Sequence, residues 1–242
     1  MTKYFTGKLS KSLSILGLAL ASAFAAHAGP PLKELVLYYP LTPVQDLSGN
    51  HNGGKIVGVV ASNSPSLVSM QKSRQLTIAI WIKPASIPRE FPEVISKGGN
   101  TSGTAYGGYE ILLNANGDND LIFISGSAEI DTHGANGRWI NNHVGEWIHV
   151  AFTINDQTKI AKFYVNGVPT NDEFDYGTYF TAGTALNFDV PNNLYVGQRD
   201  PANSGNRLDF DGSMRELMIF NRALTATEVS KIYNSTKSAI VK

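Results

Sequence analysis

The sequence predicts a single all-β domain built as a sandwich of strands, and three observations support this fold class. Short segments rich in Val, Ile, Phe and Tyr recur along the chain, some alternating with polar residues and some continuously apolar. Clusters of Gly, Asn, Asp and Ser separate these segments, which is typical of tight turns between antiparallel strands. About 214 residues follow the first 28, a length that suits one sandwich with one core. The chain shows no internal repeat and no linker, so residues 29–242 are predicted to form one domain.

Residues 1–28 are predicted to be a secretory signal peptide. They contain three lysines and no acid, then an apolar run from Leu13 to Ala26, and then Ala26-His27-Ala28, which fits the small-residue pattern of a cleavage site. The run is too short for a membrane span, and no second run of about 20 apolar residues follows it. We therefore expect cleavage near Ala28-Gly29, a secreted or periplasmic location, and no membrane insertion.

Charge and cysteine content narrow the class of partner. Without the three lysines of the leader, 17 basic and 20 acidic residues remain, so the mature surface is mildly acidic. Such a surface argues against nucleic acid and against anionic membranes as partners. The chain has no cysteine, so an exported form depends on its core, or on a bound ion, rather than on disulfides.

Ten strands are predicted in order along the chain. The clearest is Leu76 to Ile82, where Leu76, Ile78, Ile80 and Ile82 form one face and Trp81 lies on the other beside small residues, so both faces are expected to be buried. The ten predicted strands are Leu35 to Tyr39, Lys55 to Val60, Gln75 to Lys83, Glu93 to Ser96, Tyr109 to Asn114, Leu121 to Ser125, Trp147 to Ile154, Ile160 to Val165, Asn193 to Val196 and Arg215 to Phe220.

One helix is predicted, and it lies near the C-terminus. Thr225 precedes Glu228 at the spacing of a capping box, in which each side chain bonds the backbone N–H of the other residue. Val229, Ile232 and Tyr233 then form a short apolar stripe at helical spacing. These signals predict a short amphipathic helix that packs on the sandwich.

The order of several segments carries a family resemblance. Four segments in the second half of the chain are Gly145 to Thr153, Lys162 to Gly167, Asn193 to Gly197 and Phe210 to Leu224. Their order resembles that of the laminin G-like domains of the concanavalin A-like lectin/glucanase superfamily. Four earlier segments also resemble this family: Leu37 to Leu41, Asp46 to Gly53, Leu76 to Pro84 and Ile95 to Gly98. The resemblance implies a two-sheet antiparallel jelly-roll sandwich with one short C-terminal helix. The sequence departs from the family at Val60 to Arg74, which lacks the usual aromatic strand, so whether this segment forms a strand stays open.

A candidate calcium loop follows the first predicted strand. Asp46, Ser48 and Asn50 place oxygen-bearing side chains at alternate positions among glycines, a spacing that lets a curled loop direct hard oxygens at one ion. The resemblance implies a further acid from the last long strand, where this sequence has Arg215 at the family's position and Glu216 beside it. Alternating Asx and Ser residues also satisfy their own backbone in simple turns. A calcium site and an Asx turn therefore both remain open.

Catalysis is the minority prediction. The superfamily includes glucanases, whose nucleophile and acid/base project from one strand as a close set of acids. Glu129 and Asp131 imitate that motif, but His133 and Gly134 stand where its third acid would be. A solvated acidic pair at a strand end is therefore favoured over a catalytic pair, and the sequence also lacks the Arg-, His- and Tyr-rich strands of jelly-roll lyases.

Binding of a polysaccharide or glycan is the favoured prediction. Sugar recognition uses an exposed aromatic face flanked by amides, acids and Arg, and such residues gather in four predicted loops. Trp139 heads the candidates because Trp81 and Trp147, the other two tryptophans, are expected in the core. His149 is also expected in the core or in a strand, with its ring nitrogens hydrogen-bonded. The other candidate ligand-binding residues are Tyr106, Tyr176, Tyr179, Arg199, Asn203 and Arg207. Aromatic lids over the core are the competing interpretation of these side chains.

The sequence thus predicts an exported, non-catalytic, lectin-like carbohydrate-binding domain, with calcium as its candidate ion. A secreted polysaccharide hydrolase or lyase is the first alternative, and a protein-binding adhesion module is the second. The sequence does not identify the glycan, because this fold serves many functions and only the site separates them.

Overall fold

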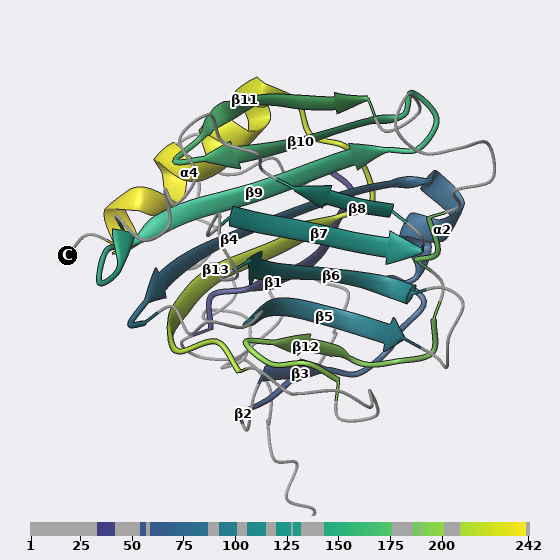
Figure 1. Cartoon of the computed structure of the whole chain (residues 1–242), viewed down its shortest axis with the longest axis horizontal. Coiled ribbons are helices and arrows are strands. Elements are labelled where there is room, and N and C mark those ends of the chain that lie inside the picture. Colours follow the sequence, from purple (N-terminus) through teal and green to yellow (C-terminus); the bar gives the residue numbers. More distant parts are fainter. Residues whose placement is uncertain are drawn as a thin grey trace, which may run out of the picture.

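The computed structural model describes residues 33–41, 54–56, 59–86, 92–100, 106–114, 120–126, 128–131, 143–175, 186–188, 190–200 and 209–240. In this part of the chain two antiparallel sheets lie face to face, with a helix on the back of one of them (Figure 1). The predicted two-sheet antiparallel sandwich with a C-terminal helix is therefore confirmed. The predicted signal peptide lies outside the described residues.

The two sheets take up all thirteen of the described strands. The six-stranded sheet has the order β1 (Leu35–Tyr39), β13 (Gly212–Phe220), β4 (Gln75–Pro84), β9 (Ile148–Asn155), β10 (Ile160–Val165) and β11 (Val168–Asp175). The seven-stranded sheet has the order β2 (Gly54–Ile56), β3 (Val59–Ala61), β12 (Leu194–Val196), β5 (Glu93–Asn100), β6 (Tyr106–Asn114), β7 (Asp120–Gly126) and β8 (Ala128–Asp131).

The main core lies between the sheets. Alternate residues of β4 and β9 face alternate residues of β6 and β7, and the rings of Phe123 and Phe152 stack across the interface with centroids 4.1 Å apart. The alternation predicted for Leu76 to Ile82 is confirmed, because all four aliphatic residues of that face are fully buried in this core. The opposite face of each sheet is therefore left for other partners.

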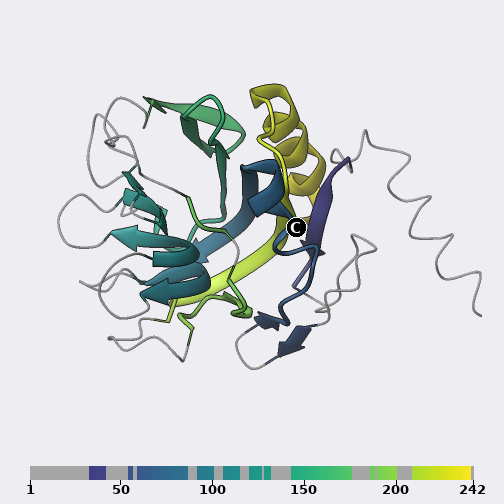
Figure 2. The same ribbon diagram turned by 90° about the vertical axis from the view of Figure 1, so that its right-hand side faces the viewer.

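Helix α4 (Ala226–Ile240) covers the outer face of the six-stranded sheet (Figure 2). Val229 and Ile232 of the helix pack against Tyr38, Met218 and other buried residues of that face, which form a second apolar cluster. The predicted apolar stripe is thus confirmed. No helix among the described residues is long and apolar enough to cross a membrane.

An aromatic group beneath α4 joins the helix to β4 and β9. The Trp81 ring is fully buried and stacks on Tyr233, with centroids 5.4 Å apart, and its Nε1 donates a hydrogen bond of 2.8 Å to Thr236 Oγ1. The His149 ring meets Trp81 edge-on at 5.4 Å and is also fully buried. Both residues belong to the interior as predicted, although they pack under the helix rather than between the sheets.

Two details of this prediction were wrong. Within the described structure neither ring nitrogen of His149 has a hydrogen-bond partner, so this histidine is buried but not satisfied. Trp147 lies just before β9 and is only partly buried, with the Arg215 guanidinium 5.4 Å from its ring centroid. Its position just before the strand leaves the ring partly exposed, which the apolar pattern around it did not indicate.

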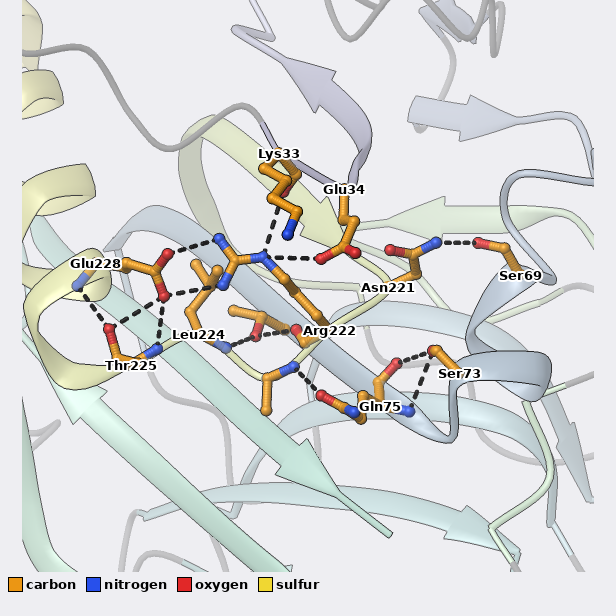
Figure 3. Close-up of polar contacts among 12 residues, drawn as sticks. Lys33, Glu34, Ser69, Ser73, Gln75, Asn221, Arg222, Leu224, Thr225 and Glu228 are labelled. Carbon is orange, nitrogen blue, oxygen red and sulfur yellow. Dashed lines mark hydrogen bonds and ion pairs between the residues drawn. The ribbon is translucent and has the colours of Figure 1, made fainter. Parts of the chain in front are cut away.

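The start of α4 is fixed by an ion-pair and capping network (Figure 3). Arg222 binds the Glu228 carboxylate with both terminal nitrogens, at 2.9 and 2.7 Å, and its Nε lies 3.2 Å from Glu34 Oε2. The Thr225 N–H donates to Glu228 Oε2 at 2.9 Å, and the Glu228 N–H donates to Thr225 Oγ1 at 3.3 Å. The predicted capping box is therefore confirmed, and the Arg222 hydrogen bonds lower the pKa of Glu228 to about 2.

Replacing Glu228 with alanine is expected to lower the free energy of unfolding by about 1 to 2 kcal/mol at pH 7, because the helix loses its cap and a bidentate partner. The lowered pKa means that the carboxylate stabilises the fold above pH 4.5 and loses that effect as the pH falls toward 2. Urea unfolding should therefore show the two proteins converging in acid. Glu146→Ala, which removes an exposed partner of His143, is the control and should change little.

The structure adds elements that the sequence pattern did not reveal. The predicted strand Lys55 to Val60 is a pair of short strands, β2 and β3, consistent with the glycine that interrupts the run. The open segment Val60 to Arg74 contains the end of β3 and a five-residue helix, α2 (Ser69–Ser73), but no further strand. The edge strands β8 and β11 were not predicted, because β8 is short and β11 is polar over Thr170 to Glu173.

Candidate functional site

A β-bulge in β5 places two polar residues on the outer face of the seven-stranded sheet. Glu93 pairs with Leu112 and Ile95 with Ile111, so two steps along β5 match one step along β6. Ile95 and Ile111 point into the core, whereas Ser96 pairs with Glu110 on the opposite face. Residues 93 and 96 would lie on opposite faces of a regular strand, and the bulge brings both to the outer face.

These residues form a compact group with Arg199, which follows β12. Arg199 Nε lies 3.4 Å from Glu93 Oε1 and 3.6 Å from Glu110 Oε1, so one guanidinium spans both carboxyl groups. The Ser96 hydroxyl donates a hydrogen bond of 3.1 Å to Glu110 Oε1. We call Glu93, Ser96, Glu110 and Arg199 the carboxylate cluster.

Burial sets the electrostatics of the carboxylate cluster. The side chains of Glu93 and Glu110 are 3% and 2% exposed, against 19% for Arg199. Burial raises the pKa of both glutamates, the Glu110 charge raises that of Glu93 further, and the Arg199 charge lowers both. Two buried carboxyl groups beside one cation therefore favour a state in which they hold a proton between them at neutral pH.

One oxygen of each glutamate side chain in the cluster lacks a hydrogen bond. Among the described residues, Glu93 Oε2 and Glu110 Oε2 have no hydrogen-bond partner although both are buried. Buried polar atoms in folded proteins are nearly always paired, because each unpaired atom costs about 1 to 3 kcal/mol. The proton that the two carboxyl groups share, a water molecule or a donor of a ligand could satisfy these oxygens.

Lys97, a buried lysine next to Ser96 in β5, has hydrogen-bond partners for its charged group. Lys97 Nζ donates to Asn63 Oδ1, Val190 O and Asn192 O at 2.9, 2.8 and 2.7 Å. Two of these bonds join β5 to the chain before β12 and the third joins it to the segment after β3, so the role of Lys97 is structural.

The register connects the carboxylate cluster with the acids that imitate a glucanase motif. Glu110 pairs with Ile124 of β7, which pairs with Glu129 of β8. Leu112, the partner of Glu93, pairs in the same way with Ile122, which pairs with Asp131. Glu129 and Asp131 thus occupy the same two cross-strand rows as the cluster, at the edge of the sheet.

The predicted ligand-binding residues are only partly within the described structure. Arg199 joins the carboxylate cluster, and Tyr106 begins β6 opposite Asn100 rather than lying in a loop. Close by, Gly98 pairs with Gly108, and the positive φ of both residues fits the close approach of the two strands. Five further predicted ligand-binding residues lie outside the described residues: Trp139, Tyr176, Tyr179, Asn203 and Arg207.

The predicted calcium ligands are divided in the same way. Asp46, Ser48 and Asn50 lie outside the described residues. Glu216 lies at a bulge in β13 with a φ of 54°, accepts a hydrogen bond of 2.5 Å from the Tyr38 hydroxyl, and donates its N–H to Pro40 O. Burial raises the pKa of Glu216. Among the residues that the structure covers, no group of three or more His, Asp or Glu side chains is arranged to hold a metal ion.

Glu93 and Glu110 were not singled out from the sequence, although one signal was present. Glu110 is a lone acid between Tyr109 and Ile111 in an otherwise apolar strand, a position where a charge is rarely buried without a partner. Glu93 carried no such signal, because its place on the outer face depends on the bulge.

Comparison with known proteins agrees with this architecture. Residues 58–230 match the laminin G family described as the concanavalin A-like lectin/glucanases superfamily. The chain is 23% identical over 223 residues to the adhesion G-protein coupled receptor V1 of Danio rerio, and the match takes in 85% of this chain but 3% of the receptor.

Two solved structures share the fold. The binding domain of Paraclostridial Mosquitocidal Protein 1 superposes with a TM-score of 0.58 and 18% identity, over 84% of this chain and 52% of that one. Domain 4 of AbnA, a GH43 extracellular arabinanase from Geobacillus stearothermophilus solved with arabinotriose, gives a TM-score of 0.51 and 19% identity over 83% of this chain and 98% of that domain. With its family match, strand order and two-sheet sandwich, the chain belongs to the laminin G branch of the concanavalin A-like lectin/glucanase superfamily.

Proposed function

We propose that this chain is an exported, non-catalytic carbohydrate-binding domain. The observation that carries the proposal is the carboxylate cluster, where Glu93 and Glu110 leave buried oxygens unpaired beside a partly exposed Arg199. Carboxylates and Arg are the side chains that hydrogen-bond sugar hydroxyls, and a sheet of a rigid sandwich holds them in fixed positions. The arabinotriose bound to the AbnA domain supports this class of ligand.

Binding fits the cluster better than hydrolysis does. A glycosidase needs one carboxyl group to reach the leaving oxygen and another to reach the anomeric carbon or a water. The Glu93 and Glu110 side chains are almost fully buried and both lie against Arg199, so neither is placed to reach an anomeric carbon or a leaving oxygen, whereas the partly exposed Arg199 can donate to a sugar oxygen. Hydrolysis stays the second candidate because these two carboxyl groups lie so close together.

The proposal is tested by a glycan array together with a reducing-sugar assay on the same preparations. We expect retention of one class of glycan and no release of reducing sugar from β-glucans or arabinan. Turnover that Glu93→Gln or Glu129→Gln abolishes would replace binding with hydrolysis as the function. Retention of no glycan would instead favour the protein-binding alternative.

Trp139 is proposed as an aromatic platform for the ligand. Its neighbours Arg138, Asn141 and Asn142 supply hydrogen-bonding groups beside a large aromatic face. Trp139→Ala is expected to weaken binding of the retained glycan at least tenfold, a loss of about 1.4 kcal/mol, while the melting temperature changes little. A loss of about 3 to 5 kcal/mol in stability, as for a buried large aromatic, would identify Trp139 as a lid on the core instead.

We also propose calcium as a stabilising ion held by Asp46, Ser48, Asn50 and Glu216. The fit of Glu216 is supported by its backbone bond to Pro40, which precedes the segment that carries the other three residues. Saturating calcium is expected to raise the melting temperature, with a dissociation constant of about 10⁻⁴ to 10⁻³ M because few ligands are charged. Chelator should remove the gain, and Asp46→Asn should abolish it. Identical melting curves with calcium and with chelator would favour the Asx turn.

A further inference from the structure

We infer that the C-terminal half of α4 is an acid-sensitive flap, which opens away from the six-stranded sheet when His149 takes up a proton. The flap comprises residues 233–240, and it lies over the rings of Trp81 and His149 on the outer face of that sheet (Figure 2). This device is independent of the proposed sugar-binding function. Three features of the structure point to it: the surroundings of the His149 ring, the fixed backbone of His149, and the unequal attachment of the two halves of α4.

The surroundings of the His149 ring leave a positive charge without hydrogen bonds. The ring is fully buried, with the Trp81 centroid 5.4 Å and the Tyr233 centroid 5.8 Å away. Neither of its nitrogens has a hydrogen-bond partner among the described residues. A protonated imidazole has two N–H donors, and burying both without acceptors is costly. The charged ring therefore requires water, which the closed flap excludes.

The backbone of His149 is fixed, so the ring cannot reach water by a shift of its own strand. β9 is paired on both sides, with β4 and with β10. The His149 N–H donates a hydrogen bond of 3.0 Å to Asn166 Oδ1, and its carbonyl oxygen accepts one of 2.8 Å from the Asn166 N–H. Because Tyr233 lies on α4 rather than in the sheet, movement of the flap is the smaller change that admits water to the ring.

The charged groups on this face favour the neutral form of His149 while the flap is closed. Burial lowers the pKa of His149 to about 3, and exposure to water returns the pKa toward its usual value. The ammonium group of Lys237 lies over the Tyr233 ring, 5.1 Å from its centroid. Glu216 is the one carboxylate among the described groups here, and it accepts a hydrogen bond from Tyr38 of β1, on the far side of β13 from β9. The titratable and charged side chains that the described parts of β4, β10, β13 and α4 place on this face are Lys83, Lys162, Tyr164, Arg215, Glu216, Tyr233 and Lys237.

The N-terminal half of α4 is firmly attached to the sheet. Val229 and Ile232 are fully buried in the second apolar cluster, and Arg222 binds the Glu228 carboxylate with both terminal nitrogens. The Arg222 hydrogen bonds lower the pKa of Glu228 to about 2. This attachment therefore persists over the pH range in which His149 takes up its proton.

The flap is attached less firmly than the N-terminal half. Its buried side chains are those of Thr236 and Ile240, and Tyr233 is only partly buried. Opening breaks the stack of Tyr233 on Trp81 and the hydrogen bond from Trp81 Nε1 to Thr236 Oγ1. A detached piece of about two helical turns is too short to stay helical by itself, so its backbone amides become exposed to solvent. The flap is therefore expected to open alone, with the capping network as its fixed end.

Hydrogen exchange followed by mass spectrometry between pH 6 and pH 4, corrected for the intrinsic exchange rate at each pH, tests this device. In the wild type, protection of the flap amides is expected to fall about 50- to 100-fold over this range, because the open state binds a proton at His149 that the closed state does not. At pH 4 the flap should be at least about tenfold less protected than β9, which stays within the sheet. His149→Phe keeps an aromatic ring but cannot titrate, so its flap protection should change less than about threefold.

His143→Gln is the matched control. It removes a histidine whose side chain is 33% exposed and whose Nδ1 lies 3.0 Å from Glu146 Oε2, and flap protection should fall as in the wild type. An equal fall in His149→Phe would overturn the inference. Equal protection of the flap and β9 at pH 4 would also overturn it, because exchange would then occur only by global unfolding. Where His149→Phe does not fold, His149→Leu takes its place, and the wild-type comparison of the flap with β9 still decides the matter.

Discussion

Replacing Trp81 with alanine is expected to lower the free energy of unfolding by about 3 to 5 kcal/mol, the range for truncation of a buried large aromatic. The ring is 1% exposed, stacks on Tyr233 and meets His149, and its Nε1 binds Thr236. Because these partners lie on α4 and on β9, the substitution removes a large part of the contact between the helix and the sheet, alongside that of Val229 and Ile232. Urea unfolding at pH 7 measures the change, and a lower m-value would show that α4 has already separated from the native fold.

Trp147→Ala is the matched control for this substitution. Trp147 is only partly buried, and the guanidinium of Arg215 lies over its ring, a pairing worth about 0.5 to 1 kcal/mol when exposed. Its truncation should therefore cost much less than that of Trp81. Equal costs for the two tryptophans would contradict the placement of α4 over Trp81.

Acidification from pH 7 to pH 4 is expected to destabilise the protein by about 3 kcal/mol through His149 alone. Burial lowers the pKa of His149 to about 3, from 6.5 in the unfolded chain. Between these two pKa values the unfolded state binds a proton at His149 and the folded state does not. The contribution of neutral His149 to the free energy of unfolding is therefore fully present above pH 6.5 and is lost as the pH falls toward 3. Among the described residues the aromatic neighbours of the imidazole are Trp81 and Tyr233, and the ammonium group of Lys237 lies over the Tyr233 ring, 5.1 Å from its centroid.

His149→Phe isolates this effect, because it keeps an aromatic ring between Trp81 and Tyr233 but cannot titrate. Urea unfolding at several pH values should show a wild-type stability that falls by about 3 kcal/mol more than that of the variant between pH 7 and pH 4. Glu93 and Glu110 act in the opposite direction, since their raised pKa values favour the folded state in acid, but they are common to both proteins. Parallel curves for the two proteins would show that His149 titrates normally.

The strands that could be predicted are those whose apolar pattern is continuous or strictly alternating. The ranges of β1 and β10 were predicted residue for residue, and β4, β7 and β9 to within one residue at each end. Strands β8 and β11 escaped because each lies at a sheet edge, where polar residues are favoured and the pattern weakens. The sequence could not tell which apolar positions pack under α4 and which lie between the sheets, because both faces of β4 are apolar.

The candidate site was less predictable than the fold. Arg199 was named because Arg in an Asn-rich loop suits sugar recognition, but its partners come from β5 and β6, about 90 to 105 residues earlier in the chain. The place of Glu93 depends on a bulge, and a bulge shifts the face of a side chain without a reliable local sequence signal. Pairing between distant strands, rather than local pattern, assembles the carboxylate cluster.

The position of β13 has a consequence for how the chain reaches its fold. This last described strand lies between β1 and β4, and it meets β1 across a sequence separation of 178 residues at Tyr38 and Glu216. Contacts of such range close slowly, so folding is expected in the millisecond-to-second range typical of sandwiches. A nascent chain that lacks β13 leaves the facing edges of β1 and β4 open, and open edges pair readily with other chains. During synthesis these two strand edges are therefore exposed to aggregation until residues 212–220 are available to pair with them.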